Sequence, residues 1–155
     1  MITVNLLRLL QIVSYLLIVG QLLFYLFLFS DALRLIPIEH FLELRKTVDS
    51  HFLGRFKVMY YTCLLISLVM TIIAARNPGS LWFFISLFAL ICLIVDTILA
   101  TRFSMPINSQ INHYSLTSDI NWEVLRDRWL QCINYRAIIS TTGFLTLVAY
   151  YIFKK

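Results

Sequence analysis

The sequence has few charged residues and few of the residues that interrupt helices. Only 14% of its 155 residues are charged, and it contains four glycines and three prolines. By contrast, 60% of the residues are hydrophobic, and the mean hydropathy is +0.82, whereas a typical soluble domain is about 45–50% apolar. Such a chain has too few polar side chains to cover a surface exposed to water. The composition therefore indicates an integral membrane protein.

Several motifs that would identify a reaction or a cofactor are also missing. The three cysteines lie far apart without a CxxC pair, so we expect neither a disulfide framework nor a metal knuckle. His40, His51 and His113 match no ligand motif such as HxxxH. The sequence contains no phosphate-binding loop and no nucleophile–base motif. We therefore predict no metal, no other cofactor and no nucleic-acid partner, and we disfavour hydrolase, kinase and metalloenzyme functions.

Four hydrophobic stretches are each long enough to cross a bilayer. A helix rises 1.5 Å per residue, so ~30 Å of hydrocarbon requires about 20 apolar residues. Helices satisfy their own backbone hydrogen bonds in lipid, whereas an open sheet does not. The first stretch does not look like a cleavable signal, because no basic segment precedes it. We predict an all-α, integral membrane four-helix bundle forming one domain over residues 1–155, with spans at about 6–29, 57–75, 81–100 and 136–153.

The connections between these spans differ in length. Residues 75–80, ARNPGS, predict a tight turn. After Pro37, apolar residues at helical spacing predict an amphipathic helix over about 37–53. A second extramembrane helix is predicted over about 121–135, leading directly into the fourth span. We expect Pro106 to start a segment that folds back over the end of the bundle.

Basic residues are divided unequally between the two sides of the predicted bundle. Four spans place both termini and the short turn on one side, with four cations, whereas the side with the long connections carries nine. Cytoplasmic loops are usually the richer in lysine and arginine. This bias predicts that the long connections are cytoplasmic and that both termini are outside.

Each predicted span carries polar or small residues along one face. Because polar groups are costly in lipid, these faces should turn inward and meet. Small and hydroxyl side chains suit close helix packing, whereas glutamine and tyrosine are bulkier than packing requires and are compatible with a polar cavity along the bundle axis. Both interpretations are open. The residues concerned include Gln11, Gln21, Tyr25, Tyr60, Ser67, Ser86, Asp96 and Ser140.

One carboxylate lies inside the third span, because Asp96 is about one helical turn from its end. An unpaired carboxylate at that depth would cost several kcal/mol or take up a proton, so Asp96 should pair with a cation. Arg102 and Arg136 are the candidates, and Asn108 and Asn112 belong to the same end of the bundle. One interpretation is a network that fixes helix register. The other is a polar ligand site at the mouth of the bundle.

The segment between residues 102 and 136 resembles a known family. RFSMPINSQIN at 102–112, NWEVLRDRW at 121–129 and NYR at 134–136 are similar to the signature of the anthrone oxygenase-like family of small four-helix membrane proteins. Characterised members oxidise tricyclic anthrones to anthraquinones without a flavin, haem or metal. The resemblance therefore implies a cofactor-independent oxygenase or oxidoreductase with the four-helix fold. The matching positions are Arg102, Pro106, Asn108, Trp122, Arg126, Trp129 and Arg136.

An oxygenase of this kind needs a base, a group that stabilises an oxyanion and a dry aromatic pocket. In this scheme Asp96 is the base, and Arg136 and Asn108 stabilise the oxyanion. A flat, lipophilic aromatic or quinone-like substrate would stack on aromatic side chains. The predicted substrate-binding residues are Gln21, Tyr25, Tyr60, Arg102, Asn112, Trp122 and Trp129.

Two non-enzymatic functions are also compatible with the sequence. The protein could bind a quinone, a lipid or another small molecule without converting it, or it could be a scaffold subunit that holds a protein partner. Basic residues beside the membrane suit anionic lipid headgroups. Membrane lipids are expected partners in every case, and a homo-oligomer or a protein partner stays open.

Overall fold

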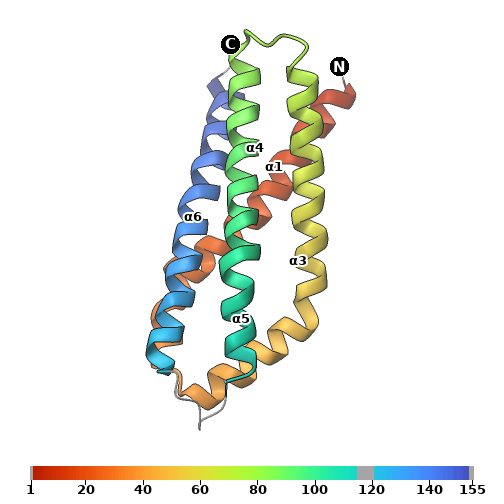
Figure 1. Ribbon diagram of the computed structural model, residues 1–155. Coiled ribbons are helices and arrows are strands. Elements are labelled where there is room, and N and C mark those ends of the chain that lie inside the picture. Colours follow the sequence, from red (N-terminus) through yellow and green to blue (C-terminus); the bar gives the residue numbers. More distant parts are fainter. Residues whose placement is uncertain (1, 115–120, 154–155) are drawn as a thin grey trace.

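The computed structural model describes residues 2–114 and 121–153, apart from the side chains of residues 2, 3, 50 and 52. Within these residues the chain is helical and has no strand. Four helical segments are long and apolar enough to cross a membrane, and they run together as four rods (Figure 1). The all-α, membrane-spanning four-helix bundle that the composition predicted is therefore confirmed.

Eight helical elements form the four rods. In chain order they are α1 (Ile2–Leu23), η1 (Phe24–Phe29), α2 (Ser30–Leu35), α3 (Ile38–Ala74), α4 (Leu81–Leu99), η2 (Ala100–Ser104), α5 (Met105–Asn112) and α6 (Trp122–Phe153). The elements η1 and η2 are π-helical and are continuous with their neighbours. The first rod is α1–η1–α2, the second is the Leu53–Ala74 part of α3, the third is α4–η2–α5, and the fourth is α6.

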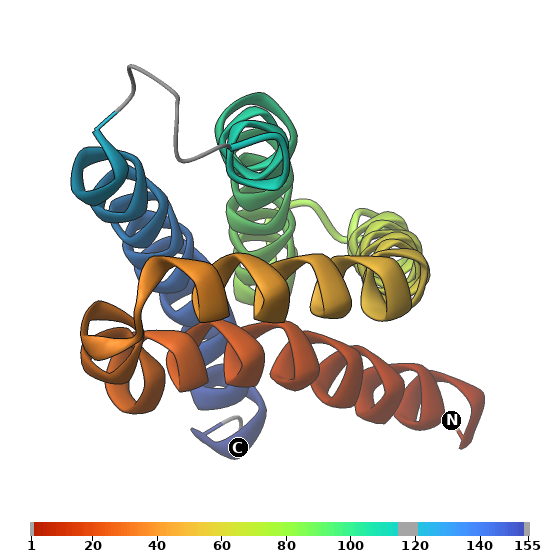
Figure 2. The same ribbon diagram turned by 90° about the horizontal axis from the view of Figure 1, so that it is seen from below.

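The segment expected as an amphipathic helix at 37–53 is the N-terminal part of α3. It crosses the end of the bundle before the helix turns upward as the second rod (Figure 2). Pro37 occupies the N-cap position, where its missing amide N–H costs no helical hydrogen bond. Phe41 and Arg45 are buried against the bundle, whereas Glu39 and Glu43 are exposed. This part of α3 therefore closes one end of the bundle with a mixed apolar and charged face.

The third rod differs from what the position of Pro106 suggested. Instead of folding back, α5 continues the line of α4 (Figure 1). A proline ring inside a regular α-helix clashes with the carbonyl four residues earlier, which here belongs to Arg102. The wider π-helical turn of η2 lies directly before Pro106 and accommodates the ring. The prediction of a fold-back was wrong because it treated the proline as the end of a helix.

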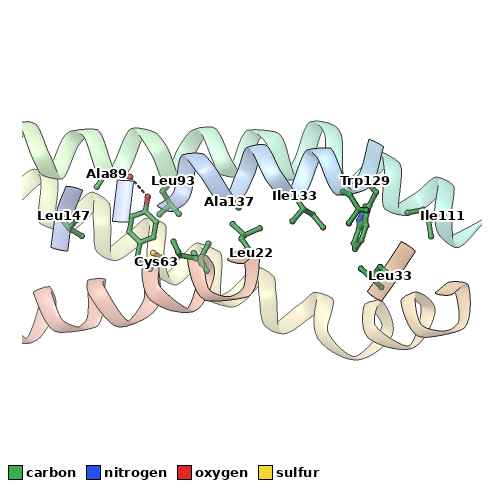
Figure 3. Packing of buried hydrophobic residues seen from close by; sticks show 14 of the residues in the cluster. Leu22, Leu33, Cys63, Ala89, Leu93, Ile111, Trp129, Ile133, Ala137 and Leu147 are labelled. Carbon is green, nitrogen blue, oxygen red and sulfur yellow. Dashed lines mark hydrogen bonds between the residues drawn. The ribbon is translucent and has the colours of Figure 1, made fainter. Parts of the chain in front are cut away.

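Buried apolar side chains from all four rods fill the interior (Figure 3). Leu22 of α1, Leu93 of α4 and Leu147 of α6 are almost completely buried in this cluster. Large apolar side chains such as Phe27 and Leu65 cover the outer surface, where they suit contact with lipid. Because lipid tails are as apolar as leucine, close packing and hydrogen bonds between helices supply much of the association energy.

The polar faces of the spans do turn inward. Gln11, Ser67, Ser86, Asp96 and Ser140 are all fully buried. In the half of the bundle near the termini, the Gln11 amide donates to the Ser67 hydroxyl at 3.3 Å, and the Tyr151 hydroxyl donates to the Gln11 carbonyl oxygen at 3.3 Å. These bonds link three rods, so packing between the helices accounts for Gln11, Ser67 and Tyr151.

The rods approach closely at Gly143. A Cβ atom at this position of α6 would lie 2.7 Å from the Cβ of Cys92 and against the hydroxyl of Tyr15. We expect Gly143→Ala to destabilise the bundle by about 1–3 kcal/mol through overpacking, measured as a lower melting temperature in detergent. Gly20→Ala is the control, because a Cβ there would meet nothing within 4 Å. Equal melting temperatures for the two variants would contradict this account of the packing.

Candidate functional site

Three side chains from three rods meet inside the bundle. The Asp96 carboxylate of α4 accepts a hydrogen bond from Nε of Arg136 in α6 at 2.7 Å. Its other oxygen accepts from the hydroxyl of Tyr60 in α3 at 2.9 Å. The Tyr60 hydroxyl in turn accepts from Nη2 of Arg136 at 2.6 Å. The result is a closed triangle of charge-assisted hydrogen bonds, which are stronger than neutral ones.

This triangle compensates the charge of the carboxylate that lies inside the third span. Asp96 is fully buried, and the Arg136 side chain is only 12% exposed. Both carboxylate oxygens are engaged, so the cost of burying the charge is offset. Of the two arginines considered, Arg136 makes the pair, whereas Arg102 is exposed. The pair also connects α4 to α6 in a fixed register.

A cavity of about 160 Å³ lies beside the triangle. Tyr60 and Arg136 line it, whereas Asp96 lies behind them and does not. Apolar side chains form a large part of the wall and include Leu22, Val48, Leu53, Phe56 and Ile133. Polar and aromatic lining residues include Gln21, Tyr25, Thr97, Thr101, Ser104, Asn108 and Trp129. The cavity is thus mainly apolar, with a few polar groups that converge, as ligand sites usually are.

The part of α3 that crosses the end of the bundle closes one side of this cavity. Its Arg45 donates to Asp49 one turn later at 2.8 Å, and the other Asp49 oxygen accepts from the Asn112 amide at 2.9 Å. The Arg45 guanidinium lies 4.9 Å from the ring centre of Trp129. The Trp129 indole N–H donates to Asn108 at 2.8 Å. These contacts hold α3, α5 and α6 together around the cavity.

Both π-helical segments border the same cavity. Tyr25 belongs to η1, and Thr101 and Ser104 belong to η2. A π-helical turn leaves out the regular i→i−4 hydrogen bonds and occurs frequently at functional sites. In η2, this turn places the Ser104 hydroxyl 3.4 Å from Nη1 of Arg136, from which it accepts a hydrogen bond. The backbone irregularities therefore coincide with the polar part of the bundle.

The charge of the cavity wall is positive. Arg45, Lys57 and Arg136 carry three positive charges, whereas Asp49 carries the one negative charge among the lining residues. Lys57 forms no ion pair with any residue that the structure describes. Asp96, directly behind the wall, offsets one more positive charge. An anionic or electron-rich ligand is therefore favoured over a cationic one.

Two polar groups at the cavity have unused hydrogen-bonding capacity. The carbonyl oxygen of Gln21 is buried and has no hydrogen-bond partner within the described chain, which is costly inside a membrane span. Arg136 has five N–H donors, of which three are used by Asp96, Tyr60 and Ser104. Two of its donors therefore remain. A ligand that carries an oxygen acceptor would satisfy the remaining donors of Arg136.

Most residues that the sequence suggested for the site lie around this cavity. Six of them line it, namely Gln21, Tyr25, Tyr60, Asn108, Trp129 and Arg136. Asp96 does not line the cavity but accepts hydrogen bonds from Tyr60 and Arg136, which do. Asn112 is connected to the cavity wall through its hydrogen bond to Asp49. Two others lie elsewhere. Arg102 is exposed, and Trp122 packs edge-on against Phe41 and Tyr114.

Sequence reasoning missed Arg45, Asp49, Lys57 and Ser104. Arg45 follows Phe41 by four residues and therefore lies on the apolar face of the amphipathic helix, with Asp49 one turn further. A charged pair on an apolar face is a signal that could have identified both residues. Lys57 and Ser104 carry no comparable signal, because lysine and serine near the end of a span are common.

Comparisons with known proteins leave the family open. A scan against protein-family models found no match. Searches of curated proteins and of solved structures also found none. In addition, no three histidine, cysteine, aspartate or glutamate side chains among residues 2–114 and 121–153 are grouped so that they could hold a metal ion. The geometry of the cavity is therefore the basis for any functional proposal.

We expect loss of the Asp96–Arg136 ion pair to destabilise the fold. Asp96→Asn keeps the shape of the side chain but leaves the buried Arg136 charge without its counterion. Breaking one partner of a buried pair typically costs about 3–5 kcal/mol, so the melting temperature in detergent should fall clearly. Asp31→Asn is the control, because Asp31 is exposed on α2 and forms no ion pair among the described residues. An unchanged melting temperature for Asp96→Asn would show that the pair does not stabilise the fold.

Proposed function

We propose that the cavity binds a small lipophilic aromatic or quinone-like molecule and that the protein oxidises it without a cofactor. The observation that carries the proposal is the Arg136 guanidinium, which Asp96 and Tyr60 hold rigidly at the wall of a largely apolar cavity. Two remaining N–H donors of this group suit a ligand oxygen that gains negative charge. Tyr25 and Trp129 provide aromatic surface for a flat ligand.

The proposed reaction is the one that the resemblance to the anthrone oxygenase-like family implies. A methylene group of the substrate loses a proton, and the carbonyl oxygen conjugated with it through the aromatic rings takes up the negative charge beside Arg136. Dioxygen then adds to the carbanion and the proton is returned, which yields a hydroperoxide. Loss of water from the hydroperoxide leaves a second carbonyl. One oxygen atom of dioxygen is thus retained in the product and the other leaves as water with the two methylene hydrogens.

In this scheme Asp96 acts as a base through Tyr60. The carboxylate does not line the cavity, but the Tyr60 hydroxyl does and donates to it at 2.9 Å. The substrate proton passes to the Tyr60 oxygen while the Tyr60 proton moves to Asp96. Arg136, which donates to the same hydroxyl at 2.6 Å, stabilises the negative charge on Tyr60 during the transfer. Asn108 is held by the indole of Trp129 and contributes to binding the substrate.

The test uses anthrone as the probe and purified protein in nanodiscs. We expect anthraquinone to form only in air, with one atom of labelled dioxygen in the product. Tyr60→Phe should lower the rate by about 10²–10⁴-fold by removing the relay, while anthrone binding changes little. Tyr135→Phe is the matched control, because Tyr135 is exposed and does not line the cavity. Equal rates for Tyr60→Phe and wild type would exclude the relay.

A non-enzymatic binding protein is the second candidate. It is favoured by the fact that both oxygens of Asp96 are already engaged, which makes the triangle a stable structural unit. Binding of anthrone to wild type without turnover, and weaker binding to Arg136→Gln, would support this function and exclude the oxygenase. Absence of binding to the wild-type protein would overturn both.

We also propose that the termini and the 76–80 turn face outward and that the cavity end of the bundle faces the cytoplasm, as the distribution of basic residues predicts. All three native cysteines are buried, so introduced ones can be labelled selectively. In intact cells, a membrane-impermeant maleimide should label Gly79→Cys, whereas Lys46→Cys should react only after permeabilisation. Both positions are exposed. The reverse pattern would invert the topology.

A further inference from the structure

A second cavity, of about 190 Å³, lies between the first rod and α6. It shares Tyr25 and Ile133 with the first cavity, but its other lining residues are different. Its polar lining residues are Ser30, Arg34, Asp127, Gln131 and Asn134. Apart from Tyr25, the residues proposed for substrate binding and catalysis do not line this cavity. Its wall combines one cation and one carboxylate with amide and hydroxyl groups, which indicates a polar ligand.

The two charges of this cavity are close together without a hydrogen bond between them. Nη2 of Arg34 lies 4.0 Å from Oδ1 of Asp127, and the two side chains are 55% and 45% exposed. Nε of Arg126 lies 3.7 Å from the same oxygen. That oxygen has no hydrogen-bond partner within the described chain. Because Oδ1 is buried while the side chain is 45% exposed, the other oxygen, Oδ2, is the one that can accept N–H donors from a ligand.

In both rods, exposed large side chains are close in sequence to the residues that line this cavity. Phe27 and Leu28 of η1 are strongly exposed, as are Tyr135 and Ile138 of α6. Arg34 follows the first hydrophobic stretch by a few residues, and Asp127 precedes the fourth by between two and three helical turns. Both therefore lie on the side of the long connections, within reach of lipid headgroups. A polar pocket with this position and these neighbours is suited to a molecule that has a polar head and apolar tails.

We propose that this second cavity binds the headgroup of a phospholipid that carries a primary ammonium, such as phosphatidylethanolamine. Arg34 would bind the phosphate, and Asp127 would accept hydrogen bonds from the ammonium. The opposite charges of the ligand match the one cation and one carboxylate of the wall. A choline headgroup has the same charges but no N–H donor, so it cannot form this hydrogen bond with Asp127. The acyl chains lie along the exposed apolar side chains of η1 and α6.

The first experiment uses the wild-type protein and a methylation series of the headgroup. The protein is reconstituted in vesicles that contain equal amounts of phosphatidylethanolamine, its N-methyl and N,N-dimethyl forms, and phosphatidylcholine. Native mass spectrometry then counts the lipids that stay bound. We expect retention to fall stepwise as N–H donors are lost, by roughly ten- to hundredfold over the series. Equal retention of all four lipids would overturn the proposal.

Substitutions locate the site. Asp127→Asn should abolish the preference for phosphatidylethanolamine over phosphatidylcholine, and Arg34→Gln should weaken retention of both. Glu123→Gln and Arg128→Gln are the matched controls, because these charges are exposed on α6 and do not line the cavity. A preference that survives Asp127→Asn would place the lipid elsewhere. Stronger retention of phosphatidylglycerol than of phosphatidylethanolamine by wild type would show a simple anion site and exclude the ammonium contact.

Discussion

The buried ion pair between Asp96 and Arg136 ties the helices of the bundle together. A charge inside a membrane span is tolerated only when a partner compensates it. Here the compensation comes from two other rods, because Arg136 belongs to α6 and Tyr60 to α3. The requirement to neutralise one carboxylate therefore fixes the relative positions of three helices. It does so with directional bonds, which apolar packing alone does not provide.

The same interactions that hold the helices also prepare a binding surface. Arg136 uses three of its five donors within the protein, so its orientation is fixed before any ligand arrives. Preorganised donors of this kind stabilise developing negative charge without the cost of reorientation. The structural and functional interpretations of the charged end are therefore compatible. A network that sets helix register is also what makes a rigid site, and the π-helical turns of η1 and η2 bring Tyr25 and Ser104 to it.

The two halves of the bundle use their polar residues differently. Near the termini, Gln11, Ser67 and Tyr151 satisfy one another across the rods, and Gly143 allows close approach. At the other end, α3 crosses below the rods (Figure 2), and larger polar side chains surround two cavities. The sequence pattern is similar in both halves, since each contains glutamine and tyrosine at helical spacing. Only the packing distinguishes residues that bond to each other from residues such as Gln21 that face a cavity.

From the amino-acid sequence alone we predicted the four spans, the inward direction of their polar faces and the need of Asp96 for a cation. These features follow from hydrophobicity, helical periodicity and the cost of a charge in lipid, which are local properties. The packing of the helices selects Arg136 as that cation, because the continuous α4–η2–α5 rod leaves Arg102 exposed while α6 brings Arg136 to Asp96. It also placed Arg45 and Asp49 at the cavity and Trp122 in a separate aromatic cluster. These outcomes depend on how each helix is rotated and where α3 turns, and both are set by contacts between residues distant in the chain.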